Sequence, residues 1–244
     1  RAPVRLHDLT LAWQGHPAVH HLSGEFASGQ LNAVVGPNGA GKSSLLAALA
    51  GQPGPQQHGR IDRPARAQVA YLPQAAALDR GVPVSVHELV AMGAWARIGS
   101  WRALDAPGRQ AVAEALAAVG LSGFERRLVG ELSVGQLQRA LFARVLVQDA
   151  ALILLDEPFN AIDARTTADL VALLRRWRGE QRTVIAVLHD LDLVRQQFDQ
   201  ALLLAREPVA WGPAAWALSD DHLRQARQMA EAWHDGAEVC HRAA

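Results

Sequence analysis

Long runs of apolar residues, separated by segments of helical periodicity, predict a mixed α/β fold. Leu31–Val35 and residues 151–155 and 183–188 are apolar without the alternation of a half-exposed strand. Such runs are typical of central parallel strands that are covered on both faces. A helix predicted over residues 164–177 joins the last two runs, so they form a βαβ unit with its loops at the carboxyl ends of the strands.

In the rest of the chain, the spacing of apolar residues changes from a strand-like to a helical period. Residues 4–22 are rich in strand formers, with a turn predicted at Gly15-His16-Pro17, and a loop predicted over 52–59 leads to short strands around Ile61 and Val69–Leu72. From Val84 the periodicity becomes helical, over 86–92 and 110–119, until about residue 148. We therefore predict one domain over 1–244: a core of 1–84 and 149–215, a helical subdomain of 85–148, and a C-terminal helix and tail of 216–244.

Composition narrows the classes of function. The 244 residues are 50% hydrophobic and carry a formal net charge of 0, which argues against broad electrostatic binding to nucleic acid or anionic lipid. No apolar run approaches the ~18 residues of a membrane span, and no secretory leader is evident. The single cysteine, Cys240, cannot form an internal disulfide. We expect a cytosolic protein that reaches a membrane only through a partner.

The only lysine of the chain, Lys42, lies in a phosphate-binding pattern. The pattern is Gly36-Pro37-Asn38-Gly39-Ala40-Gly41-Lys42-Ser43. A predicted strand precedes it and a predicted helix follows it, which is the order that a P-loop requires. Its glycines allow backbone N–H groups to turn toward phosphates, its ammonium reaches the β- and γ-phosphates, and its serine hydroxyl binds magnesium. The alternative is an ordinary glycine-rich turn between a strand and a helix.

Two acidic residues, Asp156 and Glu157, end the apolar run at 151–155. A strand tip beside a P-loop is where a carboxylate that organises magnesium belongs. We expect Asp156 to hold the metal through water and Glu157 to polarise the water that attacks the γ-phosphate. Without a P-loop, the same acids would be read as the start of a helix.

Residues 132–136, Leu-Ser-Val-Gly-Gln, would by themselves be a serine N-cap and the first turn of a helix. Placed shortly before the Asp156 strand, they resemble the signature of the ATP-binding cassette (ABC) family. Further motifs match in the family's order: Trp13 (A-loop), Gln74 (Q-loop), residues 160–163 (D-loop) and His189 (H-loop). Alone, the histidine would be read as a core or turn residue and the tryptophan as sheet packing.

The resemblance implies a P-loop NTPase fold, with a RecA-like parallel sheet, an N-terminal antiparallel β region and an inserted helical subdomain. It also implies an ATPase that works as a homodimer, each ATP lying between the P-loop of one copy and residues 133–136 of the other. Valine at position 134 departs from the family, which has glycine there. The implied catalytic residues are Glu157, His189 and Lys42; ATP would contact Trp13, Gly36, Pro37, Asn38, Gly39, Ala40, Gly41, Lys42, Ser43, Ser44, Ser133, Gly135, Gln136 and Asp163; and Mg²⁺ would be held by Ser43, Gln74 and Asp156.

An ABC ATPase without membrane spans requires a separate permease, which would place this chain on the inner face of the cell membrane. Residues 78–93 resemble the corresponding stretch of importer subunits for metals and metal chelates, most closely the zinc and manganese type. We expect zinc before manganese, with a ferric-siderophore or haem importer as the alternative, and an extracytoplasmic solute-binding protein in the system.

Two groups of residues have open interpretations. Trp95 and Trp101, flanked by Arg97 and Arg102, either face the permease or pack locally. The C-terminal region holds further possible metal ligands, whose spacing matches no standard zinc site: His222, His234, Cys240 and His241.

Another class of function shares the nucleotide motifs, namely the ABC ATPases of DNA repair and chromosome organisation. These proteins need long coiled-coil insertions or zinc modules, and the sequence has neither a heptad run nor a Cys-x-x-Cys pattern. Nucleic-acid binding would favour that class, and co-purification with a permease would favour a transporter.

Overall fold

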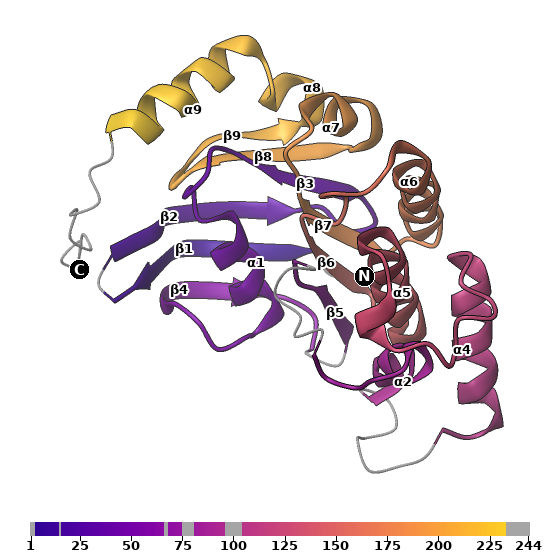
Figure 1. The fold of residues 1–244 in the computed structure, drawn as a ribbon. Coiled ribbons are helices and arrows are strands. Elements are labelled where there is room, and N and C mark those ends of the chain that lie inside the picture. The colour runs from indigo at the N-terminus through magenta and orange to yellow at the C-terminus, as the bar shows by residue number, and fades with distance from the viewer. Residues whose placement is uncertain (1–2, 15, 66–67, 75–80, 96–103, 233–244) are drawn as a thin grey trace.

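The computed structural model describes residues 3–14, 16–65, 68–74, 81–95 and 104–232. Two β-sheets and the helices around them form these parts of the molecule (Figure 1). The central sheet has six strands in the order β5-β6-β7-β3-β8-β9. They are β3 (Leu31–Val35), β5 (Val69–Leu72), β6 (Leu152–Asp156), β7 (Thr183–Val187), β8 (Gln200–Ala205) and β9 (Glu207–Pro213).

The central sheet confirms the prediction made from the apolar runs. Strands β5, β6, β7, β3 and β8 pair in parallel, and only β9 pairs antiparallel, with β8. Every residue of β3, β6 and β7 is buried. These strands need apolar side chains on both faces because helices or a second sheet cover each face, which explains why they show no alternation.

The second sheet is antiparallel, in the order β2-β1-β4: β1 (Val4–Trp13), β2 (His16–Phe26) and β4 (Gln56–Asp62). The predicted turn at Gly15-His16-Pro17 is wrong at its last two residues, because Trp13 already pairs with His16 and Ala12 with Pro17. The predicted loop over 52–59 is also too long. Strand β4 begins at Gln56 and pairs with Ala12 of β1, and its exposed polar residues gave no apolar pattern by which to find it.

Helices cover the central sheet on both faces. Their bounds are α1 (Lys42–Ala50), α2 (Val86–Ala91), η3 (Met92–Ala94), α4 (Ala106–Ala118), η4 (Val129–Glu131), α5 (Val134–Gln148), α6 (Ala164–Gly179), α7 (Leu191–Gln197), α8 (Ala214–Ala217) and α9 (Asp220–Ala232). Helix α4 starts before the predicted Gln110, because the Asp105 carboxylate caps it by accepting from the Gly108 N–H at 2.8 Å.

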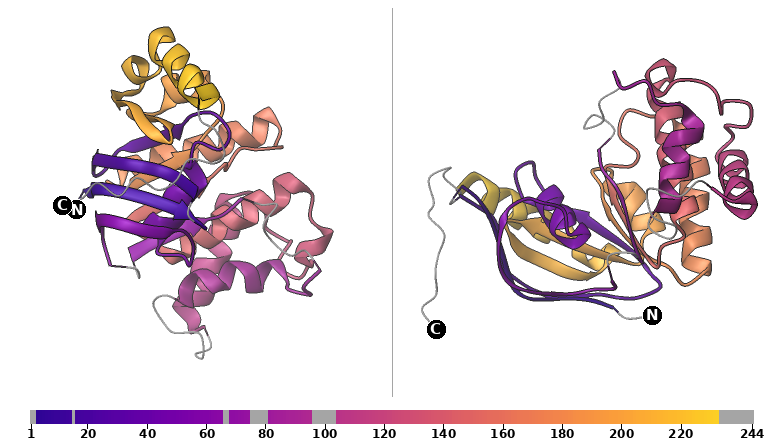
Figure 2. Two further views of the ribbon diagram at one scale, coloured as in Figure 1. Left: turned by 90° about the vertical axis from the view of Figure 1, so that its left-hand side faces the viewer. Right: turned by 90° about the horizontal axis from the view of Figure 1, so that it is seen from below.

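An apolar core lies on each face of the central sheet. One core joins α1 and the three-stranded sheet to side chains such as Val34 and Leu154. The other joins α2, α4, α5 and α6 to the opposite face, through side chains such as Ala33 and Leu155. Figure 2 shows α2, α4 and α5 gathered at the end of the molecule away from α9. Over the described ranges, no helix combines the length and apolar character that crossing a bilayer requires.

Candidate nucleotide site

The predicted site residues follow four neighbouring strands. The order β5-β6-β7-β3 places Gln74, Asp156 with Glu157, His189 and the P-loop after consecutive strands. All four strands are parallel, so these segments meet at one edge of the sheet. Residues from distant parts of the chain thus share one edge because of the strand order.

The P-loop, residues 36–43, wraps around its own lysine. The Lys42 ammonium donates to the carbonyl oxygens of Gly36 and Pro37, at 2.9 Å each. Gly41 has a φ of 90°, and a Cβ at that position would collide with the carbonyl of Ala18, so a side chain is excluded by both strain and space. The loop therefore places a buried cation and the N-terminus of α1 at the bottom of an anion cradle.

Buried charges face each other beneath this cradle. The Ser43 hydroxyl donates to Asp156 Oδ1 at 3.2 Å. Burial, followed by the nearby charge of Glu157, raises the pKa of Asp156, although the serine hydroxyl and Lys42 act in the opposite direction. Burial lowers the pKa of Lys42, and the two carboxylates oppose that shift. The Asp156 carboxylate thus pays a desolvation cost that a bound cation would relieve.

Glu157 is held from both sides. Its Oε1 lies 2.7 Å from His189 Nε2, and its Oε2 accepts from Asn160 Nδ2 at 3.2 Å. An ionised carboxylate can only accept hydrogen bonds, so donation from the imidazole to an ionised Glu157 requires the proton on Nε2. Each carboxylate oxygen has a second lone pair, which leaves Glu157 able to accept a hydrogen bond from water.

The aromatic residue predicted to meet the base lies beside the P-loop helix. The Trp13 indole N–H donates to Ser44 Oγ at 3.0 Å, and 48% of the residue is exposed. That exposure argues against simple sheet packing. Gln74, after β5, is partly buried.

The signature residues form a second cluster. Ser133 caps α5: its Oγ accepts from the Gln136 N–H at 3.2 Å, and Gln136 Oε1 accepts from the Ser133 N–H at 3.0 Å. Gly135 faces Asp163, since a Cβ on that glycine would lie 3.9 Å from Asp163 Oδ2. Val134 is 41% exposed. Because α1 and α5 pack on opposite faces of the central sheet, this cluster and the P-loop lie apart within one copy.

Sequence reasoning missed several residues that shape the site. Asn160 was assigned to the D-loop without a role, yet it holds Glu157. Glu157 has a φ of 49°, a left-handed conformation that no sequence signal predicted and that is often found at functional sites.

Two further residues near the site were also not predicted. Burial, with the nearby charge of Asp156, raises the pKa of Tyr71 to about 12. Thr166 hydrogen-bonds Asp163 through both its N–H and its hydroxyl, at 2.8 Å each.

The open interpretations are resolved only in part. Trp95 is 43% exposed, and His222 packs edge-on against Trp216 with ring centroids 4.7 Å apart. In the part of the chain that the structure describes, no group of three or more His, Cys, Asp or Glu residues could hold a metal ion. The other residues of these two predictions lie outside the described residues: Arg97, Trp101, Arg102, His234, Cys240 and His241.

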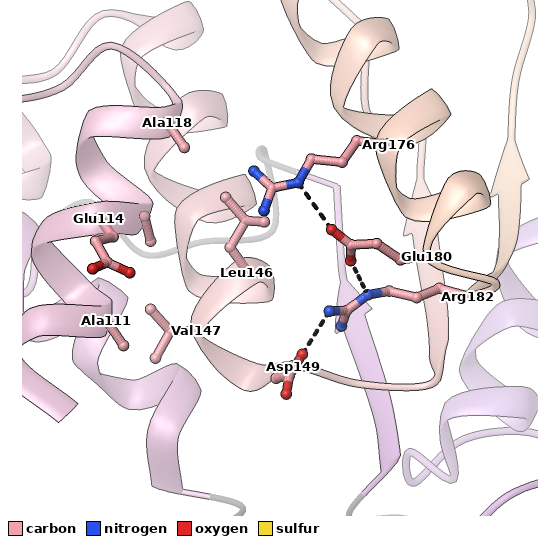
Figure 3. Close-up of a pocket in the computed structure, with 10 residues that line it drawn as sticks. Ala111, Glu114, Ala118, Leu146, Val147, Asp149, Arg176, Glu180 and Arg182 are labelled. Atoms are coloured by element: carbon pink, nitrogen blue, oxygen red, sulfur yellow. Dashed lines mark hydrogen bonds and ion pairs between the residues drawn. The ribbon is translucent and has the colours of Figure 1, made fainter. Parts of the chain in front are cut away.

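A separate hollow of about 270 Å³ lies between α4, α5 and α6 (Figure 3). Small side chains such as Ala111 and Ala118 line one wall, and an ion-pair chain lines the other. In that chain Glu180 bridges Arg176 and Arg182, at 2.9 and 2.7 Å, and Arg182 reaches Asp149 at 2.6 Å. The four charged side chains of this ion-pair chain thus satisfy one another.

Comparison with known proteins agrees with this geometry. The family model described as ABC transporter matches residues 19–160. The zinc transport system ATP-binding protein TroB of Treponema pallidum is 39% identical, over 91% of this chain and 86% of its own length. The manganese transport system ATP-binding protein MntB of Listeria monocytogenes is 35% identical, over 91% and 94%. An inward-facing ABC transporter assigned to the metal-chelate type has a similar structure, with a TM-score of 0.82, 26% identity, and coverage of 93% of this chain and 90% of that one.

Proposed function

Because the chain belongs to the ABC transporter family, as an ATP-binding and ATP-hydrolysing subunit, we propose that it drives the uptake of a metal ion through a separate permease. The observation that supports this most is the identity to zinc and manganese transport subunits, which extends over nearly the whole chain. We place zinc before manganese. Import of a metal chelate is a second candidate, favoured by the similarity to the metal-chelate type transporter.

The active unit is a head-to-tail homodimer. The P-loop helix α1 and the signature helix α5 lie on opposite faces of the central sheet, so one copy cannot surround a nucleotide with both. Two copies in opposite orientation bring Ser133, Gly135 and Gln136 of each to the P-loop of the other. The exposed Val134 then lies at the seam, where its β-branched side chain adds bulk that glycine would not.

Each nucleotide-binding residue has a role that its surroundings support. Trp13 stacks on adenine, while Lys42 and the backbone amides from Gly39 to Ser44 bind the phosphates. Lys42 exchanges the carbonyls of Gly36 and Pro37 for phosphate oxygens. Asp163 orders the segment beside Gly135 by capping α6, which starts at the next residue.

The hydrolytic step uses Glu157 and His189. Glu157 polarises the attacking water, because its carboxylate keeps free lone pairs while the hydrogen bond from Asn160 fixes its orientation. His189 Nε2, now on the carboxylate, turns to donate to the γ-phosphate when ATP is bound.

The residues fit a magnesium ion. Ser43 Oγ and Asp156 Oδ1 are hard oxygen donors only 3.2 Å apart, and Asp156 is buried next to a second carboxylate, so a divalent cation would offset unfavourable charge. Ser43, Asp156 and Gln74 would hold it. When bound, Mg²⁺ supplies charge neutralisation for the β- and γ-phosphates.

The remaining assignments concern the assembly. We propose a core of 1–84 and 149–215 that binds nucleotide, a helical subdomain of 85–148 that meets the permease, and a C-terminal helix and tail of 216–244. The homodimer sits on the cytoplasmic face of the permease, and an extracytoplasmic solute-binding protein delivers the cargo.

Two measurements test the proposal. Glu157→Gln retains the shape of the side chain but not its basicity, so ATP binding should persist while hydrolysis falls about 10²-fold or more, and an ATP-bound dimer should accumulate. Size-exclusion chromatography and phosphate release report both effects, and normal turnover in this variant would refute the role of Glu157. Vesicles that carry the whole complex should take up radioactive zinc or manganese. Uptake of a metal chelate without uptake of the free ion would refute metal-ion import and favour the second candidate, chelate import.

A further inference from the structure

Two side chains of α5 donate hydrogen bonds to the backbone of β5, an edge strand of the central sheet. Strand β5 is the last strand of the six-stranded order, so in the described part of the chain one side of its backbone has no strand partner. The Gln148 Nε2 amide donates to the Val69 carbonyl at 2.8 Å, and the Arg144 Nη2 donates to the Tyr71 carbonyl at 3.0 Å. The Gln68 carbonyl, between β5 and β6, accepts from the Ala151 N–H at 3.1 Å. The alternate carbonyls at 69 and 71 therefore face α5.

The two periodicities match. Residues four apart on a helix are about 6 Å apart along its axis, and residues two apart on a strand are about 6.6 Å apart. Arg144 and Gln148 are four apart, and Tyr71 and Val69 are two apart, so each side chain meets one outward carbonyl. Helix α5 and β5 consequently run side by side as one hydrogen-bonded unit.

This unit joins two parts of the nucleotide machinery. Helix α5 begins at the cap Ser133, in the signature, and β5 ends at Leu72, two residues before Gln74. Further contacts hold α5 in place. Arg139 donates to the Val119 carbonyl at 2.9 Å, to Thr166 Oγ1 at 3.0 Å and to Asp169 Oδ2 at 3.0 Å. The bonds to β5 therefore connect the signature helix to the start of the Q-loop.

We propose that Arg144 is a positioning residue that couples the two ATP sites, linking the signature at the partner's nucleotide to Gln74 at this copy's own nucleotide. The inference rests on the proposed dimer. It identifies the physical connection as α5 together with the two hydrogen bonds to β5.

The choice of arginine supports this role. Among the described residues, no carboxylate forms an ion pair with Arg144, and burial lowers the pKa of its guanidinium. A partly buried cation without a carboxylate partner is costly, and the neutral Gln148 satisfies the neighbouring carbonyl without that cost. The guanidinium offers five donors in a rigid plane, which suits Arg144 to hold the backbone near Gln74.

The test is Arg144→Met in the full chain, with ATP hydrolysis titrated first with ATP and then with Mg²⁺. The P-loop is untouched, so affinity for ATP should be retained. The Hill coefficient should fall toward 1, and the Mg²⁺ concentration for half-maximal activity should rise about 5-fold or more, the low end of typical coupling between sites. Arg144→Lys, which keeps a charged donor, should restore part of both. Arg175→Met is the matched control, because that guanidinium hydrogen-bonds Gln197 on the surface of α6 and α7, with no other partner among the described residues.

The possible outcomes separate this inference from the proposed function. If the wild-type chain hydrolyses ATP cooperatively and Arg144→Met changes neither the Hill coefficient nor the Mg²⁺ midpoint, the coupling role is refuted while the ATPase stands. If the wild type does not hydrolyse ATP, the proposed function itself fails. If Arg144→Met does not fold, Gln148→Met should lower the Hill coefficient and raise the Mg²⁺ concentration for half-maximal activity. No change in either quantity would then refute the inference.

Discussion

Replacing Trp13 by alanine tests the assignment of the adenine contact. The indole is 48% exposed, and its N–H reaches Ser44 Oγ at 3.0 Å, beside the P-loop helix. A half-exposed tryptophan contributes little to the core, so its removal should affect nucleotide affinity far more than stability.

The structure allows the size of the effect to be worked out. Stacking between an aromatic side chain and a base contributes about 1–3 kcal/mol, which corresponds to a loss of about 5- to 150-fold in affinity for ATP. Trp13→Phe retains a ring but loses the indole hydrogen bond to Ser44. A typical hydrogen bond contributes about 0.5–1.5 kcal/mol to stability, so this variant should lose at most about 10-fold in affinity, through poorer orientation of the ring.

Fluorescence titration with labelled ATP and with inorganic triphosphate would measure both effects. Loss of stacking should weaken ATP binding and leave triphosphate binding unchanged. Trp216→Ala is a suitable control, because Trp216 is 54% exposed and packs against His222, away from the P-loop. If Trp13→Ala bound ATP as tightly as the wild type, the stacking role would be refuted.

Other predictions concern stability. Burial raises the pKa of Asp156, so ionisation of this carboxyl destabilises the nucleotide-free protein increasingly as the pH rises above the usual pKa of aspartate. Asp156→Asn should therefore raise the thermal midpoint at neutral pH while abolishing Mg²⁺-dependent hydrolysis. An unchanged or lower midpoint would contradict this sign. Gly93→Ala would push a Cβ into the Arg144 carbonyl and to 3.1 Å from Val147 Cβ. This overpacking should cost about 1–3 kcal/mol and lower the thermal midpoint by about 2–12 °C, and a calorimetric scan with no shift would show that η3 can move away from α5.

Local pattern was enough to predict much of the fold. The apolar runs of β3, β6 and β7 reflect burial on both faces, which any strand in the middle of a covered parallel sheet must satisfy. Edge strand β4 was missed at its start, because exposed polar residues such as Gln56 and His58 belong to a strand only through pairing with β1. The pattern of apolar and polar residues reports which strands are buried, but it does not report the pairing of an exposed edge strand.

The candidate site divides in the same way. The P-loop, Asp156 and Ser133 could be predicted from the sequence because each depends on a short segment: a glycine-rich turn, the end of a strand and a helix cap. The contact of Glu157 with Asn160 and the bonds from α5 to β5 were not found, since they depend on backbone conformation and on where a distant helix packs.

The sequence by itself therefore determined the chemistry that the chain can offer, namely a phosphate cradle, a pair of carboxylates and a capped signature helix. Only the tertiary structure decided where these groups lie relative to one another. Strand order brings Gln74, Asp156 and His189 to one edge, while the two faces of the sheet keep Ser133 away from Lys42. Local segments encode their own hydrogen bonds and turns, whereas the layer on which a helix packs depends on the apolar surfaces of the entire chain.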